Sequence, residues 1–579
     1  YRRQRQMCIR DSIIIVGTLD SVVIGIFFLA LIGIIVWVVK QKQNDSADYF
    51  LGGRDATWLA IGASIFASNI GSEHLIGLAG AGASSGMAMA HWEIQGWMIL
   101  ILGWVFVPFY SRSMVYTMPE FLERRYNPQS RTILSVISLI SYVLTKVAVT
   151  VYAGGLVFQQ VFGIKELWGI DFFWIAAIGL VVLTALYTIF GGMKSVLYTS
   201  VLQTPILLLG SLIILVLGFK ELGGWDEMMS ICSAVTVNEY GDTMTQLIRD
   251  NNDPNFPWLG ALVGSAIIGF WYWCTDQFIV QRVLSGKNEK EARRGTIFGA
   301  YLKLLPVFLF LIPGMIAFAL HQKYIGAGGE GFLPLLANGT ANADAAFPTL
   351  VAKLLPAGVK GLVVCGILAA LMSSLASLFN SSAMLFTIDF YKRFKPETPE
   401  KKLVGIGQIA TVVIVILGIL WIPIMRSVGD VLYTYLQDVQ SVLAPGIAAA
   451  FLLGICWKRT SAKGGMWGLI AGMIIGLTRL GAKVYYSNTA ITDSSMFKYL
   501  FYDLNWLFFC GWMFLFCIIV VIAVSLMTEA PSAEKIQGLV FGTSTPEQKA
   551  ATRASWNHWD IIHTVIILAI TAAFYWYFW

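Results

Sequence analysis

Long apolar stretches and short polar connections alternate along almost the whole chain. Apolar runs of about twenty residues or more recur, which is the length that a helix needs to cross the hydrocarbon of a bilayer. This pattern predicts an all-α membrane protein with about fourteen transmembrane helices, near residues 14–39, 57–83, 85–110, 131–161, 170–190, 195–218, 258–281, 295–321, 350–388, 403–425, 429–456, 464–483, 504–527 and 559–578.

The composition also indicates a lipid environment. Of the 579 residues, 57% are hydrophobic and 13% are charged, and a soluble domain needs far more charge to cover its surface. The net charge of +6 comes from lysines and arginines in loops, so it does not indicate a nucleic-acid surface. Most of the seven cysteines lie in apolar spans, and we expect them to pack as small hydrophobic residues rather than to form disulfides or a metal site.

Positive charge is concentrated in every second loop. Lys40, Arg112 and Arg282 belong to this basic set, whereas the long loop from Asp226 to Asp253 is acidic. Because basic loops stay in the cytoplasm, the pattern predicts a multi-pass protein of the inner (plasma) membrane with both termini outside the cytoplasm.

Two segments contain residues that interrupt helices. They are Ser68–Ser72 and Gly269–Asp276, and they lie five predicted helices apart. This spacing suggests an inverted repeat whose unwound helices meet near the middle of the membrane to form a site. Residues 1–12 are expected to be an adaptor-derived, non-native segment, and residues 13–579 a single transport domain.

Several costly polar residues fall within the predicted spans. Each one alone could be structural, pairing with another or lying at a wet helix end. Together they favour a hydrated cavity for a neutral polyhydroxylated solute, because every sugar hydroxyl both donates and accepts hydrogen bonds. The set comprises Asn69, Glu73, His74, Glu93, Asp276, Lys303 and Gln437, with aromatic rings nearby at Trp92, Trp271, Tyr272, Trp273, Tyr433 and Tyr435.

One helix face suggests a place for Na⁺. Ala370, Ser373 and Ser374 have i, i+3, i+4 spacing, so a carbonyl and two hydroxyls share a face. Neutral oxygens suit Na⁺, and carbonyls freed by an unwound partner helix would complete the shell. Serines in membrane helices also bond to their own backbone or hold neighbouring helices together, so this pattern alone leaves both interpretations open.

A series of motifs resembles the sodium/glucose cotransporter branch of the solute:sodium symporter family, including bacterial sodium/galactose and animal sodium/glucose cotransporters. The match extends from about residue 19 to the last helix. The motifs are Ala67–Gly80, Met118–Leu122, Ala185–Gly192, Trp271–Gln277, Gln281–Arg282, Tyr301–Leu304 and Phe451–Arg459.

The resemblance implies a LeuT-like core of two inverted five-helix repeats, at residues 57–218 and 258–456, with peripheral helices at 13–39 and 464–578. It also implies symport of Na⁺ with a monosaccharide by alternating access. The implied sugar-binding residues are Asn69, His74, Glu93, Lys303 and Gln437, with gates at Tyr272, Trp273 and Tyr433. The implied sodium ligands are carbonyls of Ala67, Ile70 and Ala370 and hydroxyls of Ser373 and Ser374.

Two departures from the family pattern concern a second sodium site. Ser200 stands where relatives carry an aspartate, and Ala376 stands where members with two sodium sites carry threonine. Both changes remove oxygen ligands, so we expect one Na⁺ per sugar. The alternatives are a sodium-coupled myo-inositol or polyol symporter and a sodium-gated sugar sensor or channel. An enzyme is not expected, since the sequence shows neither a metal cluster nor a nucleophile–base pair.

Overall fold

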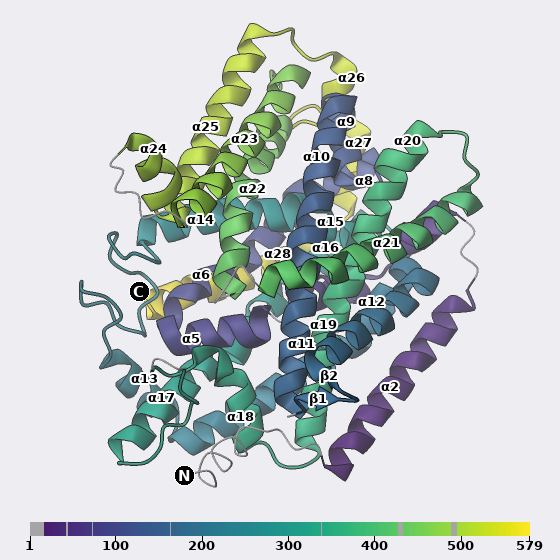
Figure 1. The fold of residues 1–579 in the computed structure, drawn as a ribbon. Coiled ribbons are helices and arrows are strands. Elements are labelled where there is room, and N and C mark those ends of the chain that lie inside the picture. Colours follow the sequence, from purple (N-terminus) through teal and green to yellow (C-terminus); the bar gives the residue numbers. More distant parts are fainter. Residues whose placement is uncertain are drawn as a thin grey trace.

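The structure is a computed structural model. It describes residues 17–579 except 42–44, 72, 163, 337–338, 427–431 and 488–494. The chain is almost entirely helical, as the apolar pattern predicts (Figure 1). The longer helices are α2 (Thr18–Val39), α4 (Trp58–Asn69), α10 (Pro128–Ser141), α11 (Ala148–Phe162), α12 (Phe172–Leu222), α14 (Trp258–Gly269), α16 (Glu289–Lys303), α17 (Ile312–Gly326), α19 (Val359–Met384), α21 (Glu400–Arg426), α22 (Leu432–Cys456), α23 (Ala462–Ser487), α25 (Trp506–Met527) and α28 (His558–Tyr577).

Shorter elements join or extend these helices. The short α-helices are α3 (Ser46–Leu51), α5 (Ala79–Ser85), α6 (Ala90–Glu93), α7 (Gly96–Ile101), α8 (Val107–Ser113), α9 (Met118–Arg125), α13 (Trp225–Ser233), α15 (Gln277–Leu284), α18 (Ala346–Leu354), α20 (Lys392–Phe394), α24 (Met496–Lys498), α26 (Ala533–Ile536) and α27 (Pro546–Ala554). The 3₁₀ and π segments are η1 (Gly52–Arg54), η2 (Glu73–Leu78), η3 (Gly86–Met89), η4 (Leu102–Phe106), η5 (Tyr142–Val147), η6 (Phe270–Thr275), η7 (Val307–Leu311), η8 (Ala343–Ala345), η9 (Leu385–Tyr391) and η10 (Tyr499–Asp503).

A small hairpin is the one pair of strands among the described residues. Strands β1 (Glu166–Leu167) and β2 (Ile170–Asp171) pair antiparallel between α11 and α12. Trp168 and Gly169 at the turn both have positive φ, at 54° and 75°. Two residues per strand are too few to change the fold class.

Eleven helical spans in the described part of the chain are long and apolar enough to cross a membrane. The all-α membrane prediction is therefore confirmed, whereas the number of fourteen is not. Part of the difference comes from α12, which runs through the predicted boundary between residues 190 and 195. Gly192 kinks this helix with φ 52°, and a Cβ at this position would overlap the Tyr49 backbone carbonyl, so glycine permits the close approach of α3.

The helices that carry the candidate site lie in the interior. Helix α4 packs against α12, α16 and α19, and α22 packs against α14, α23 and α25. Helix α2 lies at the edge beside α12 and α19 (Figure 1). Every described residue of α4 from Ala60 to Asn69 is buried, although the segment contains two serines and an asparagine. Polar groups in α4 therefore face other helices rather than lipid.

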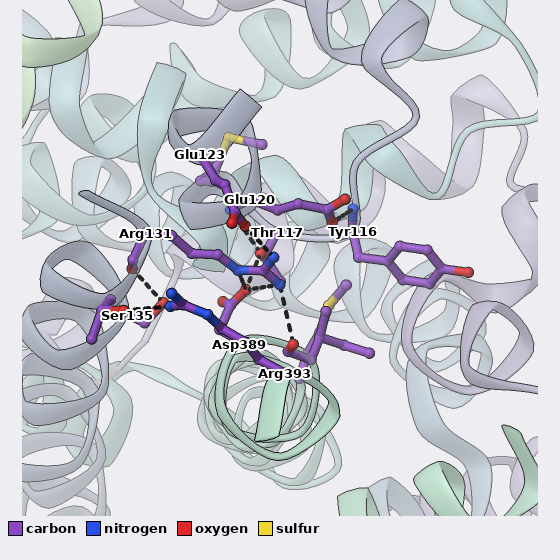
Figure 2. A network of polar contacts seen from close by, with 12 residues as sticks. Tyr116, Thr117, Glu120, Glu123, Arg131, Ser135, Asp389 and Arg393 are labelled. Atoms are coloured by element: carbon purple, nitrogen blue, oxygen red, sulfur yellow. Dashed lines mark hydrogen bonds and ion pairs between the residues drawn. The ribbon is translucent and has the colours of Figure 1, made fainter. Parts of the chain in front are cut away.

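A polar network fastens the end of η9, which continues α19, to the start of α10 (Figure 2). Arg131 lies 2.6 Å from Glu123 and 2.7 Å from Asp389, and Thr117 donates a hydrogen bond to Asp389. Arg131 also donates to the Ile388 carbonyl. These contacts tie the helix that carries Ser373 and Ser374 to an element more than two hundred residues earlier in the chain.

Candidate functional site

The first interruption lies at the end of α4. Helix α4 stops at Asn69, Ile70 is extended with φ −81° and ψ 111°, and η2 begins at Glu73. A Cβ at residue 71 would overlap the Glu73 carboxylate, so glycine allows the carboxylate to lie over the break. The break falls within the segment that the sequence predicts, and it brings Asn69, Glu73 and His74 to one level of the bundle.

The second interruption lies between η6 and α15. Asp276 is extended, with φ −77° and ψ 127°, and its carboxylate accepts the Phe278 backbone N–H at the start of α15. This break also falls within a predicted segment. Tyr272 and Trp273 belong to the π-helical turns of η6. Both residues line the cavity described next, so they lie on the same side as the first break.

A polar cavity lies between the two interrupted helices. It leaves about 60 Å³ for the centres of water molecules, which is room for several waters. Six of the eight predicted sugar-binding residues line it, together with six others: Asn69, His74, Glu93, Tyr272, Trp273 and Lys303, and Glu73, Trp92, Gln95, Ile268, Gly269 and Gln440. The side chains of the remaining two predicted residues, Tyr433 and Gln437, lie outside the described residues.

A chain of polar contacts runs along one wall of this cavity. Lys303 Nζ lies 2.6 Å from Glu93 Oε2, and His74 Nε2 lies 3.4 Å from Glu93 Oε1. The Asn69 side-chain nitrogen is in turn 3.4 Å from His74 Nε2. The Lys303 ammonium also lies 5.4 Å from the centre of the Trp273 ring. The wall thus offers charged donors and acceptors that are already held in place, which suits a solute with several hydroxyls.

A second ion pair stands behind Tyr272. Lys146 Nζ lies 2.7 Å from Asp276 Oδ2, and the Tyr142 hydroxyl donates to the other carboxylate oxygen. The Lys146 ammonium is also 4.8 Å from the ring centres of both Tyr272 and Phe278. Asp276 is one of the costly polar residues noted in the predicted spans, but Lys146 is not among them, although a lysine within a predicted span is itself a signal of function.

A smaller cavity extends from this region to Ser374, one of the predicted sodium ligands. It has about 30 Å³ for water centres and is lined by residues that include Glu73, Lys146, Thr150, Tyr272, Ser374 and Gln440. Glu73, Tyr272 and Gln440 line both cavities. Glu73 is among the polar membrane residues noted from the sequence but not among the predicted site residues. Gln95 and Gln440 are in neither group, because their uncharged amides give a weaker signal.

The predicted sodium ligands are buried where α19 meets the break after α4. The Ser374 hydroxyl donates to the Ile70 carbonyl at 3.1 Å and to the Ser68 carbonyl at 3.0 Å. The Ser373 hydroxyl lies 3.4 Å from that of Ser200. Ala67 and Ala370 are buried as well, and the contact with the Ser68 carbonyl is not expected from the sequence. One hydroxyl and two carbonyls therefore meet at Ser374, and neutral oxygens of this kind are the ligand type that a hard monovalent cation takes.

Interrupted helices around a polar cavity, within a bundle of apolar spans, define a multi-pass membrane transporter. The chain belongs to the Sodium:solute symporter family, whose sequence pattern matches residues 49–472. It is 37% identical to sodium/myo-inositol cotransporter 2 of Homo sapiens over 538 residues, which is 90% of this chain and 79% of the human protein. It is also 37% identical to sodium/glucose cotransporter 1 of Ovis aries over 529 residues, covering 88% of this chain and 79% of the sheep protein.

The fold has a counterpart among solved structures. A Na⁺-coupled sialic acid symporter in a substrate-bound, outward-open state superposes with a TM-score of 0.72 at 22% identity, covering 89% of this chain and 99% of the other. This similarity supports the fold. Family membership confirms that the chain is a sodium-coupled symporter of small molecules embedded in the membrane, and not an enzyme.

Proposed function

We propose that the protein carries a monosaccharide of the glucose or galactose type into the cell together with Na⁺, by alternating access. The observation that supports this most directly is the joining of two predicted sites. The cavity with the Glu93–Lys303 pair borders the break after α4, and so does the contact between the Ser374 hydroxyl and the Ile70 carbonyl. Glu73 and Tyr272 line the cavities on both sides. A cation that stabilises the broken segment would also stabilise the sugar-binding wall.

In this proposal the sugar hydroxyls bond to the polar wall, which is formed by Asn69, His74, Glu93 and Lys303. Gln437 and Tyr433 are assigned to the site from the sequence alone. Tyr272 closes the inner side against the sugar ring, with Trp273 beside it, since a flat ring packs on the apolar face of a pyranose while Tyr keeps a polar tip. The Tyr272 and Trp273 rings contact each other at 4.9 Å in an edge-to-face arrangement.

Na⁺ is proposed to bind the carbonyls of Ala67, Ile70 and Ala370 and the hydroxyls of Ser373 and Ser374. One ion per sugar is proposed. Ser200 supplies no charge where relatives carry an aspartate, and Ala376 supplies no hydroxyl where members with two sodium sites carry threonine. The Ser200 hydroxyl donates a hydrogen bond to the Val196 carbonyl, at 2.6 Å. Sodium binding from outside would hold the outward-facing arrangement, and loss of sodium to the cytoplasm would release the sugar.

We further propose that the protein resides in the plasma membrane with both termini outside the cytoplasm, as the loop charges favour. Core repeats at 57–218 and 258–456 would then rock against each other. These placements rest on the sequence pattern.

A cyclic polyol such as myo-inositol is the second candidate substrate. The sodium/myo-inositol and sodium/glucose cotransporters quoted above have the same identity to this chain, 37%. Both solutes present a ring of hydroxyls, so the polar wall does not separate them.

Uptake into proteoliposomes tests the proposal. An inward Na⁺ gradient should concentrate labelled glucose, galactose or myo-inositol, and a sodium ionophore should abolish the accumulation. A panel of unlabelled sugars and inositols then ranks the substrates by competition. Equilibration without accumulation would instead indicate a sodium-gated sensor or channel, and no uptake of any member would refute a sugar or polyol substrate.

A further inference from the structure

The ionisable groups of the larger cavity do not balance one another. Glu93 has a protein partner for each of its oxygens, Lys303 at 2.6 Å and His74 at 3.4 Å. Glu73 differs, because its Oε2 has no hydrogen-bond partner among the described residues. Its other oxygen is 3.9 Å from His74 Nδ1, beyond hydrogen-bonding distance. One carboxyl group of this cavity, that of Glu73, therefore lacks a bonded counterpart among the residues that the structure describes.

The nearest basic side chain beyond the cavity is already engaged. Lys146 lines the smaller cavity together with Glu73, but its ammonium lies 2.7 Å from the Asp276 carboxylate. The pair is buried, with side chains 9% and 2% exposed. Lys146 therefore offsets Asp276, and no described basic side chain forms a hydrogen bond with Glu73 Oε2.

Glu73 is also the most accessible of the ionisable groups around the cavity. Its side chain is 18% exposed, compared with 7% for His74, 2% for Glu93 and 4% for Lys303. Glu73 is the first residue of η2, after the break, and its carboxyl group lies over Gly71. A Cβ on residue 71 would overlap this carboxyl group, so glycine leaves the room that it needs. A buried carboxyl group without a bonded partner is costly at membrane depth, so an occupant that donates a hydrogen bond to Glu73 would be stabilised there.

Aromatic rings that line the same cavity favour a positively charged donor. Trp92 and Tyr272 line it, and aromatic faces attract ammonium groups that are partly desolvated. An anionic sugar would instead add a further carboxylate beside Glu73 and Glu93, and Lys303 is already paired with Glu93.

We propose that the cavity prefers an amino-substituted sugar or polyol, with its protonated amino group bonded to the Glu73 carboxylate, over the corresponding hydroxyl compound. This inference rests on the proposed sugar or polyol function and narrows its substrate class. A hydroxyl can also donate to Glu73, but a hydrogen bond between two charged groups is the stronger one. Anionic sugars such as glucuronate are the poorest ligands of the series.

Competition tests this preference, measured against sodium-driven uptake of whichever labelled solute (glucose, galactose or myo-inositol) the protein concentrates. Glucose, glucosamine, N-acetylglucosamine and glucuronate serve as unlabelled competitors. Glucosamine should inhibit at a concentration about tenfold lower than glucose in the wild-type protein. In Glu73→Gln the carboxylate is replaced by an amide of the same size. Glucosamine and glucose should then inhibit uptake at about the same concentration.

Glu227→Gln is the matched control. Glu227 pairs with Lys323 at 3.3 Å on the half-exposed α13, away from the cavity, so its loss should leave the glucosamine-to-glucose ratio unchanged. An equal ratio for the two sugars in the wild-type protein would overturn the proposal, and so would an unchanged ratio in Glu73→Gln. If Glu73→Gln instead raised the Na⁺ concentration for half-maximal uptake and kept the ratio, Glu73 would be a cation ligand and the proposal would be wrong.

Ligand-induced thermal stabilisation of the purified protein in NaCl gives a second measurement that does not need transport. Greater stabilisation by glucosamine than by glucose, lost in Glu73→Gln, supports the inference even if uptake of the variant is too weak to measure. Failure of all sugars and polyols in both assays would refute the proposed function itself. Stabilisation by glucose that equals stabilisation by glucosamine would refute only the amino preference.

Discussion

Lys146 Nζ lies 2.7 Å from Asp276 Oδ2, at the point where the second interrupted helix resumes as α15. The two residues come from segments 130 positions apart, and both are buried. The Lys146 ammonium also lies beneath the ring of the proposed inner gate, Tyr272, at 4.8 Å. This pair therefore connects the break, the gate and the helix beside the sodium-ligand cluster.

Removing both members of this pair should cost less than the sum of the two single removals. Asp276→Asn or Lys146→Met leaves an unpaired charge at membrane depth, which costs about 3 kcal/mol or more in a buried pair. The double variant should recover at least about 1 kcal/mol relative to the sum of the two single effects. Thermal unfolding of the purified protein in detergent, read for all four proteins, gives the coupling. Strictly additive shifts would mean that the two groups do not depend on each other.

Lys303→Ala should abolish concentrative sugar uptake and lower the unfolding midpoint. The change strands the buried Glu93 carboxylate, whose partner at 2.6 Å is lost. Lys323→Ala is the control, because this lysine pairs with Glu227 on a half-exposed surface and such a pair contributes at most about 1 kcal/mol. Equal effects of the two substitutions on uptake would contradict a binding role for Lys303.

Ser374→Ala should weaken the response to sodium before it weakens sugar recognition. The variant removes the hydroxyl that reaches the Ile70 carbonyl, and we expect about a tenfold higher Na⁺ concentration for half-maximal uptake, equivalent to about 1.4 kcal/mol. Apparent sugar affinity is then measured at saturating Na⁺, where it should stay near the wild-type value. Ser382→Ala, on the same helix and two turns further along, should leave the sodium response unchanged.

The ratio of sodium flux to sugar flux should be near one. One charge crossing 100 mV yields about 2.3 kcal/mol and a tenfold Na⁺ gradient about 1.4 kcal/mol, so one ion supports roughly 500-fold accumulation. Two ions would support roughly the square of that value. Parallel measurement of labelled Na⁺ and labelled sugar in proteoliposomes distinguishes the two cases, and a ratio near two would refute the single-ion proposal.

Asp389→Ala should destabilise the fold strongly, because the carboxylate holds Arg131 and Thr117 at the end of η9 (Figure 2). The expected loss is about 3 kcal/mol, which is typical of breaking a buried pair. Arg124→Ala removes a largely exposed partner of Glu120 and should shift the unfolding midpoint little. Similar midpoints for the two variants would show that the network does not hold these helices together.

Much of the candidate site could be predicted because polar residues in apolar spans are rare and conspicuous. Asn69, His74, Glu93 and Lys303 stand out for this reason, and the structure brings all four to one cavity. Lys146 has the same signal and was missed, since nothing in its own segment marks it as part of the site. Gln95 and Gln440 could not be found in this way, because an amide in a helix is common and becomes informative only when its neighbours are known.

The helix count shows the same limit for the fold. Apolar length predicts where helices are, but the backbone decides where one ends, and Gly192 kinks α12 without ending it. The interruptions at Ile70 and Asp276 were predicted correctly because glycine and polar residues cluster there.

The sequence by itself determined the solvent, the helical class and the residue types available to the site, because hydrocarbon enforces these on every segment separately. Only the tertiary structure decided which charges neutralise one another. Lys303 meets Glu93 across 210 residues, Lys146 meets Asp276, and Glu73 is left without a bonded partner among the described residues. Electrostatic pairing depends on distances of a few ångströms between segments far apart in the chain, and those distances are set by packing.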